Sequence, residues 1–361
     1  MIGSMKSATS IWSRLADVAG LVATPLVPSH YLALVSPLAA THVLKARVEA
    51  VADETADART LVLRPGRGWR SHLAGQHVRV GVELDGRIAT RMFSISSSPE
   101  RADGCITITV KAQGKVSTAL VRTVEPGTYV TLGLPEGEFV YTECPRALFV
   151  TAGSGITPVM SMLRTFGARG AMPDIVHLHY AQTPADVIFG AELRALAARF
   201  PSYRLVERYT RLPRPLSSER FSTEQLTALV PDWRTREAWA CGPQGLLDAL
   251  DQTFAAVGRT LHLEHFTAQL AAPANASGGL VRFGKSRVDA ISDGKTPLLQ
   301  LAEAAGVAAP HGCRMGICHT CDATLTSGCV RDLRTGERID EPGARIQICV
   351  CAAAGDVALD V

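Results

Sequence analysis

A group of cysteines near the C-terminal end is the feature that most constrains this chain. In the stretch "HGCRMGICHTC", Cys313, Cys318 and Cys321 follow the spacing C-x4-C-x2-C. Cys349 and Cys351 lie 28 and 30 residues beyond the last of these. This is the plant-type spacing for a 2Fe-2S cluster held by four thiolates. A zinc site, which pairs C-x2-C with a second close pair of ligands, and a redox dithiol fit it less well.

A disulfide framework is argued against by length and by cysteine distribution. The chain has 361 residues, and six of its nine cysteines fall in the last fifty. Secreted disulfide scaffolds are short, with evenly spread cysteines. The net charge of +3 gives no argument for a nucleic-acid partner, and 47% hydrophobic residues exclude a disordered chain. We therefore expect a multi-domain cytoplasmic protein.

The pattern of predicted strands and helices along the sequence indicates three domains. Residues 43–144 contain alternating or apolar runs such as "HVRVGVEL" and "CITITV", which predict an antiparallel β-barrel. In residues 145–266 strands alternate with helices, which predicts a doubly wound parallel α/β sheet. Residues 267–279 are small and polar and predict a linker. Residues 280–361 predict a compact α+β domain around the cysteines.

An apolar leader, residues 1–42, precedes these domains. Residues 18–44 contain no Asp, Glu, Lys or Arg, but prolines interrupt them and no apolar run is long enough to span a membrane. Asp17 and the lack of a small-residue cleavage site argue against a signal peptide. Two interpretations stay open: the leader packs on the first domain, or it contacts a membrane or a membrane-bound partner.

A cluster that exchanges one electron at a time needs a source of electrons. The segment "TAGSGITP" ends a predicted strand and begins a helix. Gly153 and Gly155 would allow close approach of the backbone to a pyrophosphate at the helix N-terminus. "CGP" (Cys241, Gly242, Pro243) repeats this arrangement on a later strand. Together the two segments predict a site for a nicotinamide nucleotide.

A flavin would connect the two-electron nicotinamide to the one-electron cluster. In "RMFSISSSP", Arg91 offers a guanidinium for a phosphate, Phe93 an aromatic face and Ser94 a hydroxyl for the ring. "GKVS", from Gly114 to Ser117, offers a second turn for a phosphate. We therefore predict a flavin site in the β domain.

These segments together resemble the ferredoxin–NADP reductase superfamily, in members with a C-terminal plant-type ferredoxin domain of β-grasp fold. The resemblance covers the chain from about residue 43 to its end. It implies catalytic roles for Ser94, Cys241 and Glu264 beside the flavin ring. The cofactor contacts that it implies are Arg91, Phe93, Ser94, Gly114, Val116, Ser117 and Phe266 for the flavin, and Thr151, Gly153, Gly155, Thr157, Pro158, Gly242 and Pro243 for the nicotinamide nucleotide.

The resemblance also selects between alternatives that the residues leave open. It implies that Cys349, rather than Cys351, is the fourth ligand beside Cys313, Cys318 and Cys321. In family members the last ligand is followed by a valine and then by a residue that does not bind iron, and Cys349 is followed by Val350 and Cys351 in the same way. The apolar leader and "PHGCRMGICHTC" resemble bacterial reductases that serve membrane fatty-acid desaturases and hydroxylases. That likeness implies FAD rather than FMN.

The expected function is an NAD(P)H-dependent iron–sulfur flavoprotein reductase that passes electrons to a terminal oxygenase or desaturase, such as a membrane di-iron enzyme. Two alternatives are the reductase of a soluble aromatic-ring dioxygenase or cytochrome P450, and a non-catalytic electron carrier. We expect a cytoplasmic monomer, held at the inner face of the membrane if the leader docks there.

The sequence favours NADPH over NADH. The strand "DIVHLHYAQT" ends without the Asp or Glu that commonly holds a ribose 2′-hydroxyl. Arg208 and Arg211, in "ERYTR" at the end of the next strand, could pair with a 2′-phosphate. The alternative interpretation is that both are solvated surface arginines.

Overall fold

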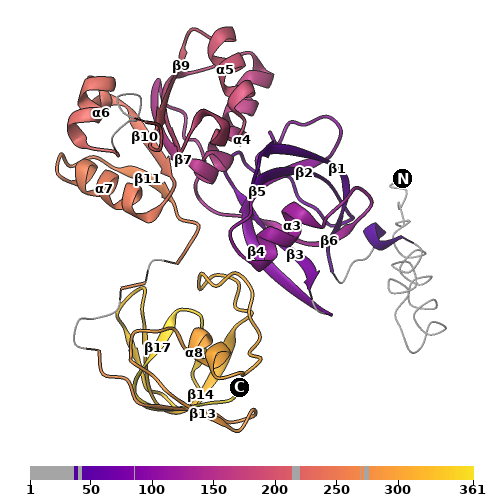
Figure 1. Ribbon diagram of the computed structural model, residues 1–361, viewed down its shortest axis with the longest axis vertical. Helices are drawn as coiled ribbons and strands as arrows, with labels where there is room; N and C mark the ends of the chain where they lie inside the picture. Colours follow the sequence, from indigo (N-terminus) through magenta and orange to yellow (C-terminus); the bar gives the residue numbers. More distant parts are fainter. Residues whose placement is uncertain (1–35, 40–42, 85, 214–219, 269, 272–275) are drawn as a thin grey trace, which may run out of the picture.

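Three sheets divide the chain into a barrel module, a parallel-sheet module and a C-terminal module (Figure 1). The computed structural model describes residues 36–39, 43–84, 86–213, 220–268, 270–271 and 276–361. The architecture confirms the fold class predicted from the sequence: an antiparallel sheet, a parallel α/β sheet and a small α+β module.

The barrel module is a six-stranded antiparallel sheet with the strand order β4-β3-β6-β1-β2-β5. A bridge between Ile95 and Ile108 joins the two edges and closes the sheet. Buried and partly exposed side chains alternate at the start of β3, because one face of the strand covers the core. The elements are β1 (Lys45–Thr55), β2 (Ala58–Pro65), β3 (His77–Leu84), β4 (Arg87–Ser94), β5 (Ile106–Lys111), α3 (Lys115–Arg122) and β6 (Tyr129–Glu136).

The parallel-sheet module has the strand order β11-β10-β7-β8-β9, with every neighbouring pair parallel. Helices follow the strands, as the alternating sequence predicts. The elements are β7 (Arg146–Ala152), η2 (Gly153–Gly155), α4 (Ile156–Arg169), β8 (Asp174–Ala181), η3 (Pro184–Asp186), α5 (Gly190–Arg199), β9 (Tyr203–Tyr209), α6 (Thr223–Leu229), η4 (Trp233–Thr235), β10 (Glu237–Cys241), α7 (Gln244–Ala255) and β11 (Leu261–Glu264).

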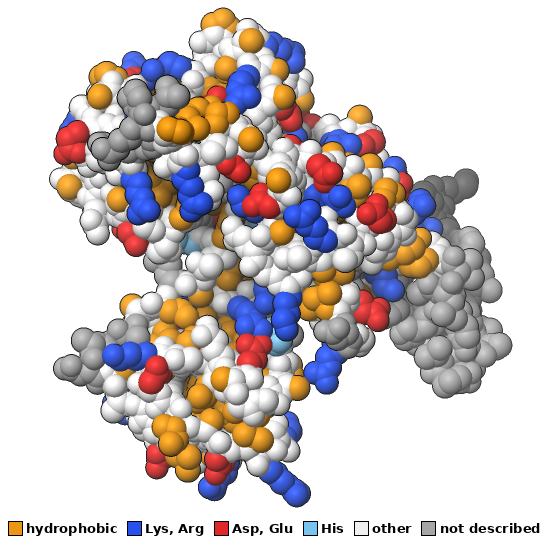
Figure 2. All heavy atoms as spheres, viewed as in Figure 1, with side chains coloured by type: hydrophobic (Ala, Val, Ile, Leu, Met, Phe, Trp, Pro, Cys, Tyr) orange, Lys and Arg blue, Asp and Glu red, His pale blue; other side chains and the backbone are white. Residues whose placement is uncertain are grey.

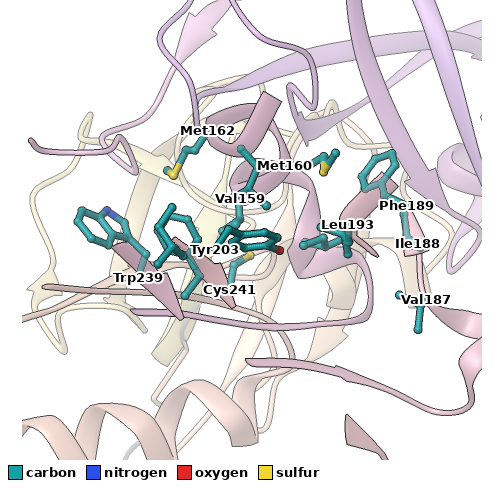
Figure 3. Packing of buried hydrophobic residues seen from close by; sticks show 14 of the residues in the cluster. Val159, Met160, Met162, Val187, Ile188, Phe189, Leu193, Tyr203, Trp239 and Cys241 are labelled. Carbon is teal, nitrogen blue, oxygen red and sulfur yellow. The ribbon is translucent and has the colours of Figure 1, made fainter. Parts of the chain in front are cut away.

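Each face of the parallel sheet is covered by a separate apolar core. On one face, Met160 of α4 and Leu193 of α5 pack with Trp239 and Cys241 of β10 (Figure 3). On the other face α6 and α7 pack through residues such as Leu226 and Leu250, both fully buried. Burial on both faces explains why the strands of this sheet read as nearly continuous apolar runs.

The C-terminal module is a mixed sheet with the path β13-β12-β17-β14-β15, and β16 pairs with β14. The pair β12–β17 is parallel, whereas β12–β13 and β14–β17 are antiparallel. Leu298, Leu299 and Ala302 of α8 fill the core against this sheet. The elements are β12 (Leu280–Phe283), β13 (Val288–Ile291), α8 (Leu298–Ala304), β14 (Asp322–Asp332), β15 (Arg338–Ile339), β16 (Arg345–Gln347) and β17 (Cys351–Leu359).

The predicted leader and linker lie partly outside the described residues. Of the leader, the short 3-10 turn η1 (Pro37–Ala39) is described, and the carbonyl of Leu38 accepts the N–H of Arg67 at 2.8 Å. Within the linker, the N–H of Ala271 donates to the carbonyl of Leu333 at 2.7 Å. No helix among the described residues is long and apolar enough to cross a membrane.

Helix α4 of the parallel-sheet module docks on the serine-rich segment that follows β4. Ser161 Oγ donates to the carbonyl of Ser97 at 2.6 Å, and Arg164 Nη1 donates to the carbonyl of Ser96 at 2.8 Å. Both contacts use backbone oxygens, so they fix the path of the chain after Ser94. The two modules are thereby held with the predicted flavin segment against the start of α4.

Candidate functional site

A cavity of about 300 Å³ opens between the barrel and the start of α4. Eight of the predicted cofactor residues line it, from β4, the "GKVS" turn, α4 and the segment after β11. The full lining is Arg91, Met92, Phe93, Ser94, Thr109, Val110, Lys111, Gln113, Gly114, Lys115, Val116, Ser117, Ser154, Thr157 and Phe266.

Ser94 is a buried polar residue in the wall of this cavity. Its side chain is 3% exposed, and its Oγ makes no hydrogen bond within the described chain. A buried hydroxyl without a partner is rare in folded proteins and indicates a bound polar group. The cavity therefore suits a flavin ring that offers a hydrogen-bonding edge to Ser94, with Phe93 and Phe266 as apolar wall.

In the "GKVS" turn, side chains stabilise the conformation of the turn and backbone N–H groups are available to bind an anion. Ser117 Oγ accepts the N–H groups of Gln113 and Gly114 at 3.0 and 2.9 Å, which holds the turn in shape. Val116 is buried in the barrel core as well as lining the cavity wall. Gly114, by contrast, has open space where a Cβ would stand. The turn thus presents backbone N–H groups at the start of α3, where an anion is favoured.

The loop between β7 and α4 depends on its two glycines. Gly153 has φ +54°, a conformation that favours glycine. A Cβ on Gly155 would stand 2.1 Å from the carbonyl oxygen of Cys241, so only glycine lets the loop pack against the "CGP" segment. Thr157 lines the cavity from the first turn of α4, and Pro158 follows it where no helical N–H partner is lost.

The hydroxyl of Thr151 points into the core of the parallel-sheet module. The residue is fully buried, and its Oγ1 lies 2.7 Å from both His177 Nε2 and His179 Nδ1. His177 Nδ1 in turn lies 2.8 Å from the hydroxyl of Tyr203. Burial lowers the pKa of both histidines, that of His179 to about 4, so the network is neutral at pH 7. Thr151 therefore anchors the strand below the loop, a role that its place in the motif did not reveal.

The three residues with predicted catalytic roles come from two modules. Cys241 is fully buried at the end of β10, and burial together with the nearby Glu264 carboxylate raises the pKa of its thiol. Glu264 stands opposite Cys241 on β11. Its Oε1 lies 3.0 Å from Nδ1 of His77, and His77 stands opposite Ser94 in the barrel. His77 was not predicted, because "HVRVGVEL" carries only a strand pattern.

The remaining nucleotide residues lie at the carboxyl ends of the parallel strands. Gly242 packs so closely that a Cβ would stand 3.2 Å from Cβ of Ala152, and Pro243 caps the start of α7. Arg208 and Arg211 lie at the end of β9 and just beyond it. Nε of Arg208 is buried without a hydrogen-bond partner in the described chain, whereas Arg211 is exposed.

The cysteine loop wraps around its own thiols. Three residues within six positions have left-handed backbone: Arg314 (φ +61°), Gly316 (φ +71°) and His319 (φ +55°). The N–H of Cys313 points at Cys318 Sγ at 3.2 Å, and the N–H groups of two following residues point at Cys313 Sγ. Such a ring of N–H groups around sulfurs stabilises thiolates. Strained residues of this kind concentrate at functional sites.

Cys349 joins this loop and Cys351 does not. The Cys349 thiol shares a hydrogen bond with Cys321, which lowers the pKa of Cys321 to about 7 and raises that of Cys349. Cys351 is 1% exposed at the start of β17, and burial raises the pKa of its thiol to about 12. The described residues contain no compact group of ligands for a single metal ion, and four thiolates around two irons form a wider ring.

Arg91 connects the flavin cavity with the cysteine loop. Its Nη1 donates to the carbonyl of Gly312, the residue before Cys313, at 2.8 Å. Burial, followed by the nearby Arg314, lowers the pKa of Arg91. A Cβ on Gly312 would stand 3.0 Å from Thr90 Oγ1 and 2.7 Å from Cys318 Sγ, so the contact requires glycine. Figure 2 shows basic, acidic and histidine side chains together where the C-terminal module meets the barrel.

Three family models match the chain in the order that this geometry suggests. The oxidoreductase FAD-binding domain matches residues 45–141, the oxidoreductase NAD-binding domain matches residues 149–252, and the 2Fe-2S iron-sulfur cluster binding domain matches residues 282–354. The barrel side of the cavity, the glycine loop and the first three cysteines with Cys349 each fall within the matching model. The predicted FAD, nicotinamide nucleotide and 2Fe-2S cluster are confirmed by these matches.

Curated relatives match most of the chain. An NADPH oxidoreductase of Mycobacterium tuberculosis is 47% identical, covering 97% of this chain and 93% of the relative. The ferredoxin reductase component of 3-ketosteroid-9-alpha-monooxygenase from the same organism is 32% identical over 80% of this chain and 86% of its own length. The structure of phthalate dioxygenase reductase shares the fold, with a TM-score of 0.62 and 22% identity over 88% of this chain and 98% of its own. The chain therefore belongs to the ferredoxin–NADP reductase type of flavoproteins with a C-terminal 2Fe-2S domain, and it is an NAD(P)H-dependent oxidoreductase.

Proposed function

We propose that this protein takes electrons from NADPH and delivers them, through FAD and the 2Fe-2S cluster, to a terminal oxygenase or desaturase. One observation carries the proposal: Arg91 lines the flavin cavity and also donates to the carbonyl of Gly312 beside the first cluster cysteine. The cavity and the cysteine loop are therefore neighbours. The name of the monooxygenase reductase relative supports an oxygenase as acceptor.

In this proposal the chain's residues position the cofactors and exclude water. When bound, the nicotinamide supplies a hydride, the flavin divides the electron pair, and the cluster passes single electrons on. Ser94 orients the ring by its free hydroxyl, and Cys241 forms a dry wall beside the nicotinamide. Cys313, Cys318, Cys321 and Cys349 hold the irons. None of these side chains needs to act as a nucleophile.

The proposed acceptor is a membrane-bound di-iron enzyme, with the reductase at the inner face of the membrane. Support comes from the uncharged apolar stretch 18–44 and from the resemblance of the cysteine segment to reductases of membrane desaturases. The contact between Leu38 and Arg67 favours packing of at least the end of the leader on the barrel. A soluble oxygenase is the second candidate, which the monooxygenase relative favours.

The test is a truncated protein that starts near Thr41, assayed with two acceptors. Ferricyanide is small and bypasses the partner, whereas a membrane oxygenase needs docking. We expect near-normal ferricyanide reduction and weaker coupling to the membrane oxygenase. Loss of flavin on truncation would instead make the leader part of the barrel core. Full-length protein that reduces a soluble oxygenase but no membrane enzyme would favour the second candidate.

NADPH is the proposed coenzyme, with Arg208 and Arg211 on its 2′-phosphate. Replacing either arginine by alanine removes a charge-assisted hydrogen bond worth about 1.5–3 kcal/mol. The kcat/KM for NADPH should therefore fall about 10- to 100-fold, and the kcat/KM for NADH should be unchanged. Arg204→Ala is the matched control, because this arginine lies on the same strand but donates to the carbonyl of Leu229. A wild-type preference for NADH would refute the proposal.

A further inference from the structure

The hydrogen bond between His77 and Glu264 joins the barrel to the parallel sheet. The two residues are 187 positions apart, His77 Nδ1 lies 3.0 Å from Glu264 Oε1, and each side chain is 12% exposed. Glu264 stands beside Cys241, which is fully buried. Glu264 lies two residues before Phe266, which lines the cavity, so the bond leads from beside the proposed flavin site into the barrel.

The strand register identifies the neighbours of His77 within the barrel. In the antiparallel pairs of the barrel, His77 stands directly opposite Ser94 on β4 and directly opposite Glu136 on β6. Residues that face each other across antiparallel strands point to the same side of the sheet. The row Ser94–His77–Glu136 therefore runs from a buried hydroxyl, through a nearly buried imidazole, to an exposed carboxylate.

The position of the imidazole is built into the backbone. Gly137 has φ +105°, and a Cβ there would stand 2.9 Å from both Cε1 and Nδ1 of His77. Gln76 Nε2 donates to the carbonyl of Gly137 at 3.2 Å and holds that turn in place. Any other residue at position 137 would push the ring away from Glu264. The turn therefore supports the ring rather than merely ending β6.

Coenzyme oxidation leaves a proton to remove. The balance is NADPH → NADP⁺ + H⁺ + 2e⁻, and the electrons leave through the C-terminal module. We propose that the proton leaves by another route: the Glu264 carboxylate, two residues before the cavity residue Phe266, takes it up beside the cavity, His77 accepts it at Nδ1, and the ring releases a proton to water beside Glu136. This inference rests on the proposed flavin site. It assigns His77 as a positioning and relay residue that acts through Glu264.

Other ionisable groups surround this route. Cys241 is neutral, because burial and Glu264 raise the pKa of its thiol. His265 follows Glu264 in the chain, and burial lowers its pKa. Glu136 and Glu138, on either side of Gly137, are exposed and present negative charge at the outer end. The largely buried His77–Glu264 pair therefore lies between the cavity and the exposed carboxylates at the outer end.

The decisive variant is His77→Gln in the full-length holoprotein. Glutamine keeps an N–H for Glu264 but cannot carry a proton. The flavin content, the iron content and the KM for NADPH should equal those of the wild-type protein. Turnover with ferricyanide should fall about 10- to 100-fold, a loss of the size expected when a general acid–base group is removed. The solvent isotope effect and the pH dependence of turnover should change with it. In His77→Ala, added imidazole should restore turnover.

His262→Gln is the matched control. Its imidazole Nε2 lies 2.7 Å from Glu237 Oε1, so it forms a similar pair on the strand that carries Glu264. This pair stays within the parallel sheet and does not reach the barrel, so turnover should be unchanged. A readout independent of activity is the ¹⁵N shift of the His77 ring, which should move in Glu264→Gln. Wild-type turnover and isotope effect in His77→Gln, or loss of flavin from it, would overturn the relay. Because ferricyanide replaces the partner, failure of the proposed acceptor would not affect this test.

Discussion

At the scale of single residues, neighbours decide which cysteines can hold iron. Cys349 shares a hydrogen bond with Cys321, whereas Cys351 is buried beside Asp332. We therefore expect Cys349→Ser to abolish the visible absorbance of the cluster and about half or more of the bound iron, and Cys351→Ser to keep both. The measurement is iron content with absorbance and EPR spectra of the reduced protein. The opposite result would exchange the two roles.

The buried histidine pair predicts a dependence of stability on pH. The pKa of His179 is lowered from 6.5 to about 4 by burial, so between these values the unfolded chain binds a proton that the folded chain does not. Its contribution to stability is complete above pH 6.5 and is lost as pH falls toward 4, about 2 kcal/mol between pH 7 and pH 5. His177, also shifted downward, acts in the same direction.

Urea unfolding at pH 7 and pH 5, followed by the fluorescence of Trp233 and Trp239, should show this loss. Both tryptophans are fully buried in the parallel-sheet module and report on it. In His179→Gln the free energy of unfolding should be lower at pH 7 but should fall about 2 kcal/mol less on acidification. An unchanged difference between the two pH values would argue against a neutral buried His179.

At the scale of elements, Arg236 ties together the starts of three parallel strands. It is 6% exposed, and it donates to Asp174 Oδ1 at 2.9 Å, to Asp232 Oδ1 at 3.0 Å and to the carbonyl of Ala147 at 3.2 Å. These strands begin at one edge of the sheet, whereas the glycine loop and the "CGP" segment lie at the other. The clamp therefore stabilises the module without touching the site.

Replacing this arginine should separate stability from activity. Arg236→Met leaves carboxylates and a carbonyl without their donor, which costs about 3 kcal/mol of unfolding free energy. The kcat with ferricyanide at 25 °C should equal that of the wild-type protein. Arg282→Met is the control, because its ion pair with Asp289 is exposed to solvent and adds little to stability. A similar loss in both variants would show that the clamp adds nothing.

Element order and local motifs could be predicted from the sequence because they depend on short-range pattern. The strand–helix alternation, the glycine loop and the C-x4-C-x2-C spacing are each visible in stretches of neighbouring residues. The bonds from His77 to Glu264 and from Arg91 to Gly312 join residues 187 and 221 positions apart, so no local pattern marks them. Thr151 was predicted from its motif as a nucleotide contact, yet its hydroxyl turns inward to two histidines whose side chains share its face of the sheet.

At the scale of the whole molecule, electrons should pass from flavin to cluster within one chain. Residues 280–361 contain nine Lys and Arg and ten Asp and Glu, a net charge of 9 − 10 = −1. A separate ferredoxin commonly relies on a strongly charged face for steering, whereas a tethered module has a high effective concentration. Single-turnover cluster reduction should therefore be independent of protein concentration and change little with salt. A rate proportional to concentration would mean transfer between molecules.

The way the barrel holds the C-terminal module has a consequence for protein engineering. Arg91 donates to a main-chain carbonyl, and the close approach demands only that the residue there be glycine. A backbone acceptor is offered by any loop of the same shape, whatever side chains surround it. We expect ferredoxin modules from other reductases to be interchangeable on this barrel when they keep that glycine, so that electron acceptors could be exchanged by swapping one cassette.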